Sequence, residues 1–233
     1  SITKIMTVLL AMEEIDAGRM KYDDIIRGIK NERIQAAVSA AAELYLSTGI
    51  NDAKMTDIAE QAQIGVASLY RYFGTKQLFT VKVGAYIWKT TMMKLEPLYT
   101  SAEYHTKTGY EQVAALLNIF HILLQEHRPF LRFLSEFDVF VIREHLGIVQ
   151  LTEYESCSMN MLPVMTEAMK KGVEDGTIRP DVDANVFYDA ITDSLLSMCE
   201  KFVWGNVPNN VDQTRNQQAL SMAIDMFLAY IRK

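Results

Sequence analysis

The chain has 233 residues, of which 49% are hydrophobic, and this is enough for a packed core in one large domain or two smaller ones. Its two cysteines do not suggest the framework of a disulfide-rich secreted protein, and its four histidines lack the spacing of a metal site. The formal net charge is −6, but residues 21–80 carry seven basic and seven acidic residues, so the acidity lies elsewhere. We therefore expect a globular cytoplasmic protein that needs no metal or other cofactor.

Residues 1–20 show a helical pattern that is too short and too acidic for a membrane span or a signal peptide. Residues 1–24 resemble the nucleophile segment of serine D-Ala-D-Ala carboxypeptidases, with Ser1 and Lys4 in the S-x-x-K positions. Residues 158–160 and 107–109 imitate the other two boxes of that family, but in the wrong order along the chain. A serine acyl-transferase or carboxypeptidase-like remnant is therefore kept as the alternative hypothesis.

The next segment, residues 31–47, has apolar residues at helical spacing and ends at Thr48-Gly49. Lys30 and Arg33 lie at the start of this helix.

Residues 55–79 read as two short helices separated by a turn at Gln63-Ile64-Gly65. In the first helix, Met55, Ile58, Ala59 and Ala62 form one apolar stripe. In the second helix, Leu69 and Phe73 face inward, while the outward positions are Val66, Ala67, Ser68, Tyr70, Arg71 and Tyr72. Small groups at the helix start, followed by hydroxyls and a guanidinium, suit a DNA major groove and its phosphate walls.

This stretch resembles the helix-turn-helix of the tetracycline-repressor (TetR) family of bacterial transcription regulators. The matching positions are Asp57-Ile58-Ala59, Ala62, Leu69-Tyr70, Tyr72-Phe73 and Lys76, with Phe79 in the place of a leucine. Three positions differ from the family pattern: Lys54 stands at the first helix cap, Gln63 at the turn glycine and Gly65 at the second cap.

The resemblance implies double-stranded operator DNA as a partner. We expect bases to be approached by Thr56, Val66, Ala67 and Ser68, and phosphates to be bound by Lys30, Arg33, Tyr70, Arg71, Tyr72, Thr75 and Lys76. A helical hairpin whose tyrosines merely pack inside a larger bundle is the alternative interpretation.

A long helix is predicted from Lys76 to Glu96, before Pro97. Further helices are predicted over residues 110–126, 129–144, 149–174, 183–204 and 213–232, with loops at 101–108, near 147, at 172–181 and at 205–212. The segment 176–183 is similar to the connector that precedes the penultimate helix in many members of the family, which extends the resemblance to about residues 27–233.

Two functions are predicted for the second half of the chain. Methionine and aromatic side chains suit a pocket for a small apolar or planar molecule, and the pocket candidates are Trp88, Met92, Phe120, His121, Phe133, Phe137 and Met161. Wide apolar stripes on residues 183–204 and 213–232 favour a homodimer. Packing within the protomer is the alternative for both features.

The sequence therefore predicts an all-α protein with an extension at 1–24, a DNA-binding head at 25–80 and an effector-binding and dimerisation domain at 81–233. Its expected function is that of a ligand-responsive homodimeric repressor of a palindromic operator, without enzymatic activity and without a membrane partner. A helical adaptor between proteins is a third hypothesis.

Overall fold

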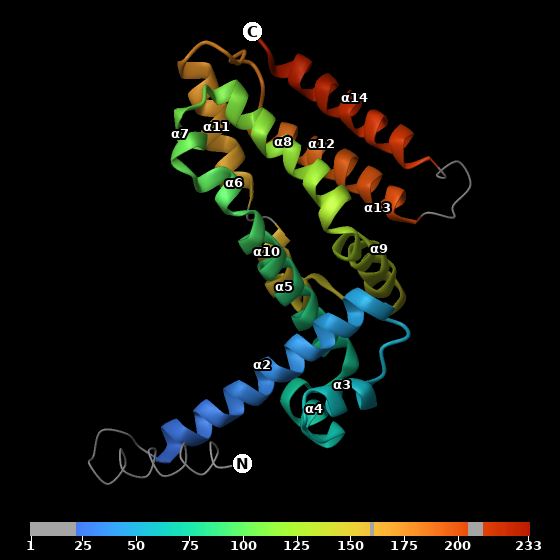
Figure 1. Ribbon diagram of the computed structural model, residues 1–233. Coiled ribbons are helices and arrows are strands. Elements are labelled where there is room, and N and C mark those ends of the chain that lie inside the picture. The colour runs from blue at the N-terminus through green and yellow to red at the C-terminus, as the bar shows by residue number, and fades with distance from the viewer. Residues whose placement is uncertain (1–21, 159–160, 205–211) are drawn as a thin grey trace.

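The computed structural model describes residues 22–158, 161–204 and 212–233 (Figure 1). The helices are α2 (Tyr22–Thr48), α3 (Met55–Gln61), α4 (Val66–Phe73), α5 (Lys76–Leu95), α6 (Pro97–Thr100), α7 (Ala102–Thr106), α8 (Gly109–Glu126), α9 (Arg128–Arg143), α10 (Ile148–Ser158), α11 (Leu162–Glu174), α12 (Ala184–Ile191), the π-helical turn η2 (Thr192–Leu196), α13 (Ser197–Val203) and α14 (Gln213–Ile231). The described residues form no strand, although Ile178 and Arg232 make an isolated antiparallel bridge. The predicted all-α fold is confirmed.

Three predicted boundaries were wrong. Helix α2 begins at Tyr22 rather than at residue 31, because no proline interrupts this stretch and a lone glycine is tolerated in a helix. The segment 149–174 forms two helices, α10 and α11, and Pro163 lies in the first turn of α11, where its missing N–H breaks no helical hydrogen bond. The predicted loop 101–108 contains α7, which the Ser101 side chain caps by accepting from the Tyr104 N–H.

The head is formed by α3, α4 and the second half of α2. Ala37 and Ala41 on α2, Ile58 on α3 and Leu69 on α4 are all fully buried. The small alanines let α2 lie close to the two short helices, and burying each large aliphatic side chain stabilises the head by about 1.5–3 kcal/mol. A Leu69→Ala change would remove the only fully buried residue of α4 and release this helix from the head.

A seam of side chains joins the head to the rest of the molecule. The hydroxyls of Tyr45 and Thr80 are 2.9 Å apart and buried, and the Tyr45 ring stacks on Phe133 of α9 with centroids 6.4 Å apart. Glu136, also on α9, accepts a hydrogen bond from the Ile50 N–H at 2.9 Å. We call these five residues the head–body seam.

The body lies beyond α5, which leads away from the head with α10 packed along it (Figure 1). Helices α8 and α11 pack so closely that a side chain at Gly109 of α8 would collide with the backbone of Ala168 and Gly172 on α11. A side chain at Gly172 would collide with Ile178, which follows α11. Helix α14 returns alongside α12 and α13 (Figure 1). Asp183 and Asp212 cap α12 and α14 by accepting backbone N–H bonds. Within the described residues, no helix has both the length and the apolar character needed to cross a membrane.

Candidate nucleic-acid interface and ligand cavity

The turn between α3 and α4 holds the two helices at a fixed angle. Gln63 adopts a left-handed backbone conformation with φ of 55°, which explains why a glycine is common at this point of the sequence pattern. Gly65 then has the extended conformation of an N-cap and precedes α4. Leu69 is buried in the head, and the Phe73 ring lies 4.5 Å from the Phe79 ring. Because one side of α4 is fixed inward, its other side is presented outward.

The outward side of α4 carries small, hydroxyl and cationic groups. Ala67 and Arg71 are exposed, Ser68 is half-buried, and Tyr70 is 46% exposed. The Arg71 guanidinium lies 5.3 Å from the centre of the Tyr72 ring and also reaches the Ser68 hydroxyl at 3.4 Å. Val66 differs from the prediction, because it is half-buried and packs against the head core.

A cationic cluster forms where α2 meets α4. The guanidinium of Arg71, and to a lesser degree that of Arg33 on α2, hold the pKa of Tyr72 below its usual value. This effect requires both guanidinium groups to lie near one hydroxyl, although they come from different helices. Lys30 is exposed one helical turn before Arg33. The cluster of Arg33, Arg71 and Tyr72 therefore combines positive charge with hydrogen-bond donors on one surface, as phosphate binding requires.

The remaining predicted DNA contacts also have local partners. The Thr56 hydroxyl donates to Asp57 Oδ1 at 3.1 Å. Thr75 caps α5 by accepting from the Leu78 N–H at 3.2 Å. Lys76 is half-buried, and its Nζ donates to the Ala53 carbonyl at 3.4 Å, so it ties α5 to the loop before α3. A phosphate would have to share this ammonium group with that carbonyl.

An apolar cavity of about 70 Å³ lies in the body. Four of the predicted pocket residues, Trp88, Met92, Phe120 and Met161, line it. The other lining residues are Leu116, Ile119, Leu123, Met165, Tyr188, Ile191, Thr192 and Leu196. Its volume is smaller than the roughly 300–1,000 Å³ of typical ligand pockets, so a drug-sized molecule needs additional space.

The structure does not bring the other three predicted pocket residues to this cavity. Phe133 and Phe137 are 0% and 1% exposed, and their rings pack against each other with centroids 5.5 Å apart. Phe137 also stacks on Tyr154 of α10. His121 is directed toward α14, where its Nε2 lies 3.3 Å from the Ser221 hydroxyl. These side chains serve packing and helix contact in this conformation.

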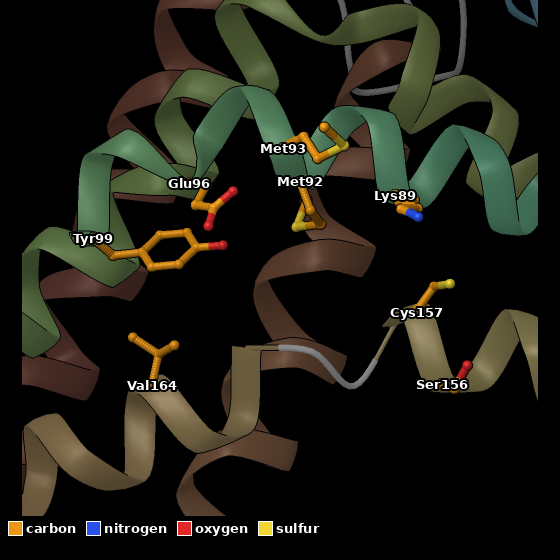
Figure 2. Close-up of a pocket in the computed structure, with 8 residues that line it drawn as sticks. All are labelled: Lys89, Met92, Met93, Glu96, Tyr99, Ser156, Cys157 and Val164. Atoms are coloured by element: carbon orange, nitrogen blue, oxygen red, sulfur yellow. The ribbon is translucent and has the colours of Figure 1, made fainter. Parts of the chain in front are cut away.

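A second, open cavity of about 520 Å³ lies between α5 and the helices α10 and α11 (Figure 2). It is lined by Lys89, Met92, Met93, Glu96, Tyr99, Ser156, Cys157 and Val164. Of these residues, only Met92 is among the predicted pocket residues. The signal was the spacing of residues 89, 92, 93 and 96, which puts all four on one face of α5.

Helices α12 and α14 leave apolar side chains exposed. Phe187, Ile191, Leu195 and Leu220 are buried within the protomer, so part of each predicted stripe is used in its own core. The exposed members are Val186 (66%), Met222 (66%), Met226 (68%) and Tyr230 (54%). We call these four residues the α12–α14 face.

The residues of the alternative enzymatic site receive no support as a group. Ser1 and Lys4 lie outside the described residues, as do residues 159 and 160 of the second box. Thr108 of the third box is the N-cap of α8 and forms a reciprocal capping box with Glu111. In the described part of the chain, no group of three or more His, Cys, Asp or Glu side chains is arranged to hold a metal ion.

One family model matches the part of the chain that contains the helix-turn-helix. The family model described as "Bacterial regulatory proteins, tetR family" matches residues 37–79. No sequence among the curated proteins matches the chain.

Three solved structures share the fold. A TetR-family transcriptional regulator from Mesorhizobium loti MAFF303099 has a TM-score of 0.66 and 14% identity, with 88% of this chain and 98% of that one covered. Reduced NemR from E. coli has a TM-score of 0.61 and 14% identity, with coverage of 86% and 98%. The ketosteroid transcriptional regulator KstR2 of Mycobacterium tuberculosis has a TM-score of 0.55 and 17% identity, with coverage of 86% and 95%. These findings identify the helix-turn-helix region of the chain as that of the tetR family of bacterial regulatory proteins, carried on the all-α fold that such regulators share.

Proposed function

We propose that the protein is a homodimeric, ligand-responsive repressor that binds a palindromic DNA operator. The observation that carries the proposal is the outward side of α4, where Arg71 and Tyr72 meet Arg33 of α2 while Leu69 fixes the helix from within. A recognition helix needs this division between an anchored face and a polar, cationic face.

The contacts divide by chemistry. Ala67 and Ser68 lie at the N-terminal end of α4, where small side chains allow the helix to approach base edges, and Thr56 at the start of α3 assists. Lys30, Arg33, Tyr70, Arg71 and Tyr72 bind phosphates on the groove walls. Thr75, the first amides of α5 and Lys76 bind a further phosphate. Val66 contributes by positioning α4 rather than by touching a base.

Dimerisation supplies the second half-site contact. The α12–α14 face is apolar. When two copies meet through a two-fold axis at this face, one contact buries the apolar face of each copy. Two heads would then read half-sites about one helical turn, or roughly 34–36 Å, apart, or a multiple of this distance.

The effector is a small, largely apolar molecule that binds among the helices of residues 81–169 and moves α5. The apolar cavity around Met92 supports this location, and the description of the M. tuberculosis neighbour as a ketosteroid regulator supports an apolar class of ligand. A typical coupling of about 1–3 kcal/mol between two sites would weaken operator binding by roughly 5- to 150-fold.

The DNA assignment is tested by titrating labelled duplexes from the region upstream of the gene, at several salt concentrations. Arg71→Ala should weaken binding to every duplex and reduce the salt slope by about one, because one phosphate contact is lost. Ser68→Asn should instead change which duplex is preferred. Lys170→Ala, which removes an exposed cation from α11, is the control and should change neither property. Absence of any salt-dependent duplex binding by the wild-type protein would refute the proposed function.

A further inference from the structure

The end of α9 lies beside one of the proposed phosphate sites. Gln77, in the first turn of α5, donates from its side-chain Nε2 to the Glu144 carboxylate at 2.9 Å. Gln77 directly follows Thr75 and Lys76, which form that site together with the first amides of α5. Glu144 is the C-cap of α9, and the next residue, His145, has a left-handed backbone with φ of 53°. A carboxylate of the body therefore lies against the helix turn that we propose binds a phosphate.

Glu144 carries a negative charge at neutral pH. The Gln77 amide and then the Arg143 guanidinium hold the pKa of this carboxyl below its usual value. The charge of Lys76 acts in the same direction to a smaller extent, so the ammonium that a phosphate would use is within electrostatic range of the carboxylate. Salt screens such a repulsion only in part over distances near the Debye length, which is about 8 Å at physiological ionic strength. An ionised Glu144 therefore disfavours a phosphate at the start of α5.

Arg143 compensates this charge and connects it to the loop before α3. Its Nε donates to Glu144 Oε1 at 3.2 Å, and its Nη1 donates to the side-chain oxygen of Asn51 at 2.9 Å. The side chains of Arg143 and Glu144 are 50% and 26% exposed, so the pair lies at the surface rather than in the core. The field that a bound phosphate would meet therefore depends on both members of the pair.

We propose that Glu144 opposes operator binding at the phosphate site of Lys76 and that Arg143 limits this opposition. Two adjacent residues of the body thus change operator affinity in opposite directions, although neither needs to touch the DNA. This inference rests on the proposed function, because it requires a DNA phosphate at the start of α5.

The test compares operator binding by Glu144→Gln, Arg143→Gln and the wild-type protein. Glu144→Gln keeps an oxygen that can accept from Gln77 but removes the charge, so it should tighten operator binding about 2- to 10-fold at low salt. Arg143→Gln leaves the Glu144 charge uncompensated and should weaken binding by a similar factor. Both effects should shrink as the salt concentration rises. Weaker binding by Glu144→Gln would overturn the proposal, because contacts that only hold the loop before α3 predict a loss from either substitution.

Two further variants separate local charge from structure and from net charge. Arg143→Lys keeps the charge without the planar fork that reaches both Asn51 and Glu144, so it should bind operator like the wild-type protein. A loss as large as that of Arg143→Gln would overturn the electrostatic role. Glu174→Gln removes the same charge from α11, which lies at the other end of the molecule from α3 and α4 (Figure 1), and should leave operator affinity unchanged. Salt-dependent binding by the wild-type protein tests the proposed function by itself, and if it is present while Glu144→Gln binds no more tightly, this inference alone fails.

Discussion

Glu200 lies on α13, and the pKa of its carboxyl is raised. Burial, followed by the nearby carboxylate of Asp138, raises the pKa of Glu200 from 4.5 to about 7. Burial also raises the pKa of Asp138. A raised folded-state pKa means that the folded protein holds its proton where the unfolded chain has lost it. The resulting stabilisation is complete below the unfolded pKa of 4.5 and is lost as the pH rises to about 7.

We therefore expect Glu200→Gln to stabilise the protein more at about pH 8 than at about pH 5, because glutamine never pays the desolvation of a buried charge. The readout is the difference in Tm between variant and wild type at the two pH values, followed by circular dichroism. Glu174→Gln changes an exposed side chain on α11 and should shift Tm equally at both pH values. A Glu200→Gln shift in Tm that does not depend on pH would contradict the raised pKa of this carboxyl.

Individual residues also show how far the sequence alone could lead. The stripe that buries Leu69 was predictable, because helical period alone decides which side of a short helix faces inward. The contact of Lys76 with the Ala53 carbonyl was not, since it depends on how a loop folds back toward α5. The helical spacing of apolar residues could not distinguish Phe120 from Phe133, because both face the interior. Phe120 lines the apolar cavity, whereas Phe133 does not.

At the scale of elements, α9 connects three parts of the molecule. The guanidinium of Arg132 lies 5.5 Å from the centre of the ring of Trp204, the residue that follows α13. The same guanidinium is 3.8 Å from the carboxylate of Glu136. Glu136 in turn accepts from the Ile50 N–H in the loop before α3. The sequence indicates only the continuous helix α5 as a connection between head and body, because a contact between residues distant in the sequence leaves no local pattern. The head–body seam adds α9 as a second connection.

Glu136 is the side chain through which this second connection can be tested. Glu136→Ala should lower the free energy of unfolding by about 1–2 kcal/mol, because the Ile50 N–H loses its partner in a partly buried position. Glu136→Gln keeps an oxygen acceptor at the same place and should cost less than half as much. Urea denaturation followed by circular dichroism provides the comparison. Equal losses in the two variants would mean that the charge on Glu136, and not its hydrogen bond to the loop, holds the seam.

At the scale of the whole molecule, the α12–α14 face leaves apolar side chains exposed on the surface of the protomer. The residues of the α12–α14 face are more than half exposed, and the hollow beside them has a volume of about 670 Å³ lined by residues such as Phe187, Ala223 and Phe227. Their neighbours at helical spacing are buried in the protomer. A second copy related by a two-fold axis would cover both faces and would set the distance between the two heads.

Dimerisation through this face predicts that charge on it separates the protomers. Val186→Asp combined with Met226→Asp places two carboxylates where an apolar contact is expected, so sedimentation velocity at micromolar concentration should find a monomer in place of the wild-type dimer. A monomer holds only one half-site, and losing the linked second contact should weaken operator binding by about 10²- to 10⁴-fold. Val173→Asp on α11 adds a carboxylate at another exposed apolar position and should leave both mass and operator affinity unchanged. If the double variant remained dimeric with full operator affinity, the two copies would have to meet through a different surface.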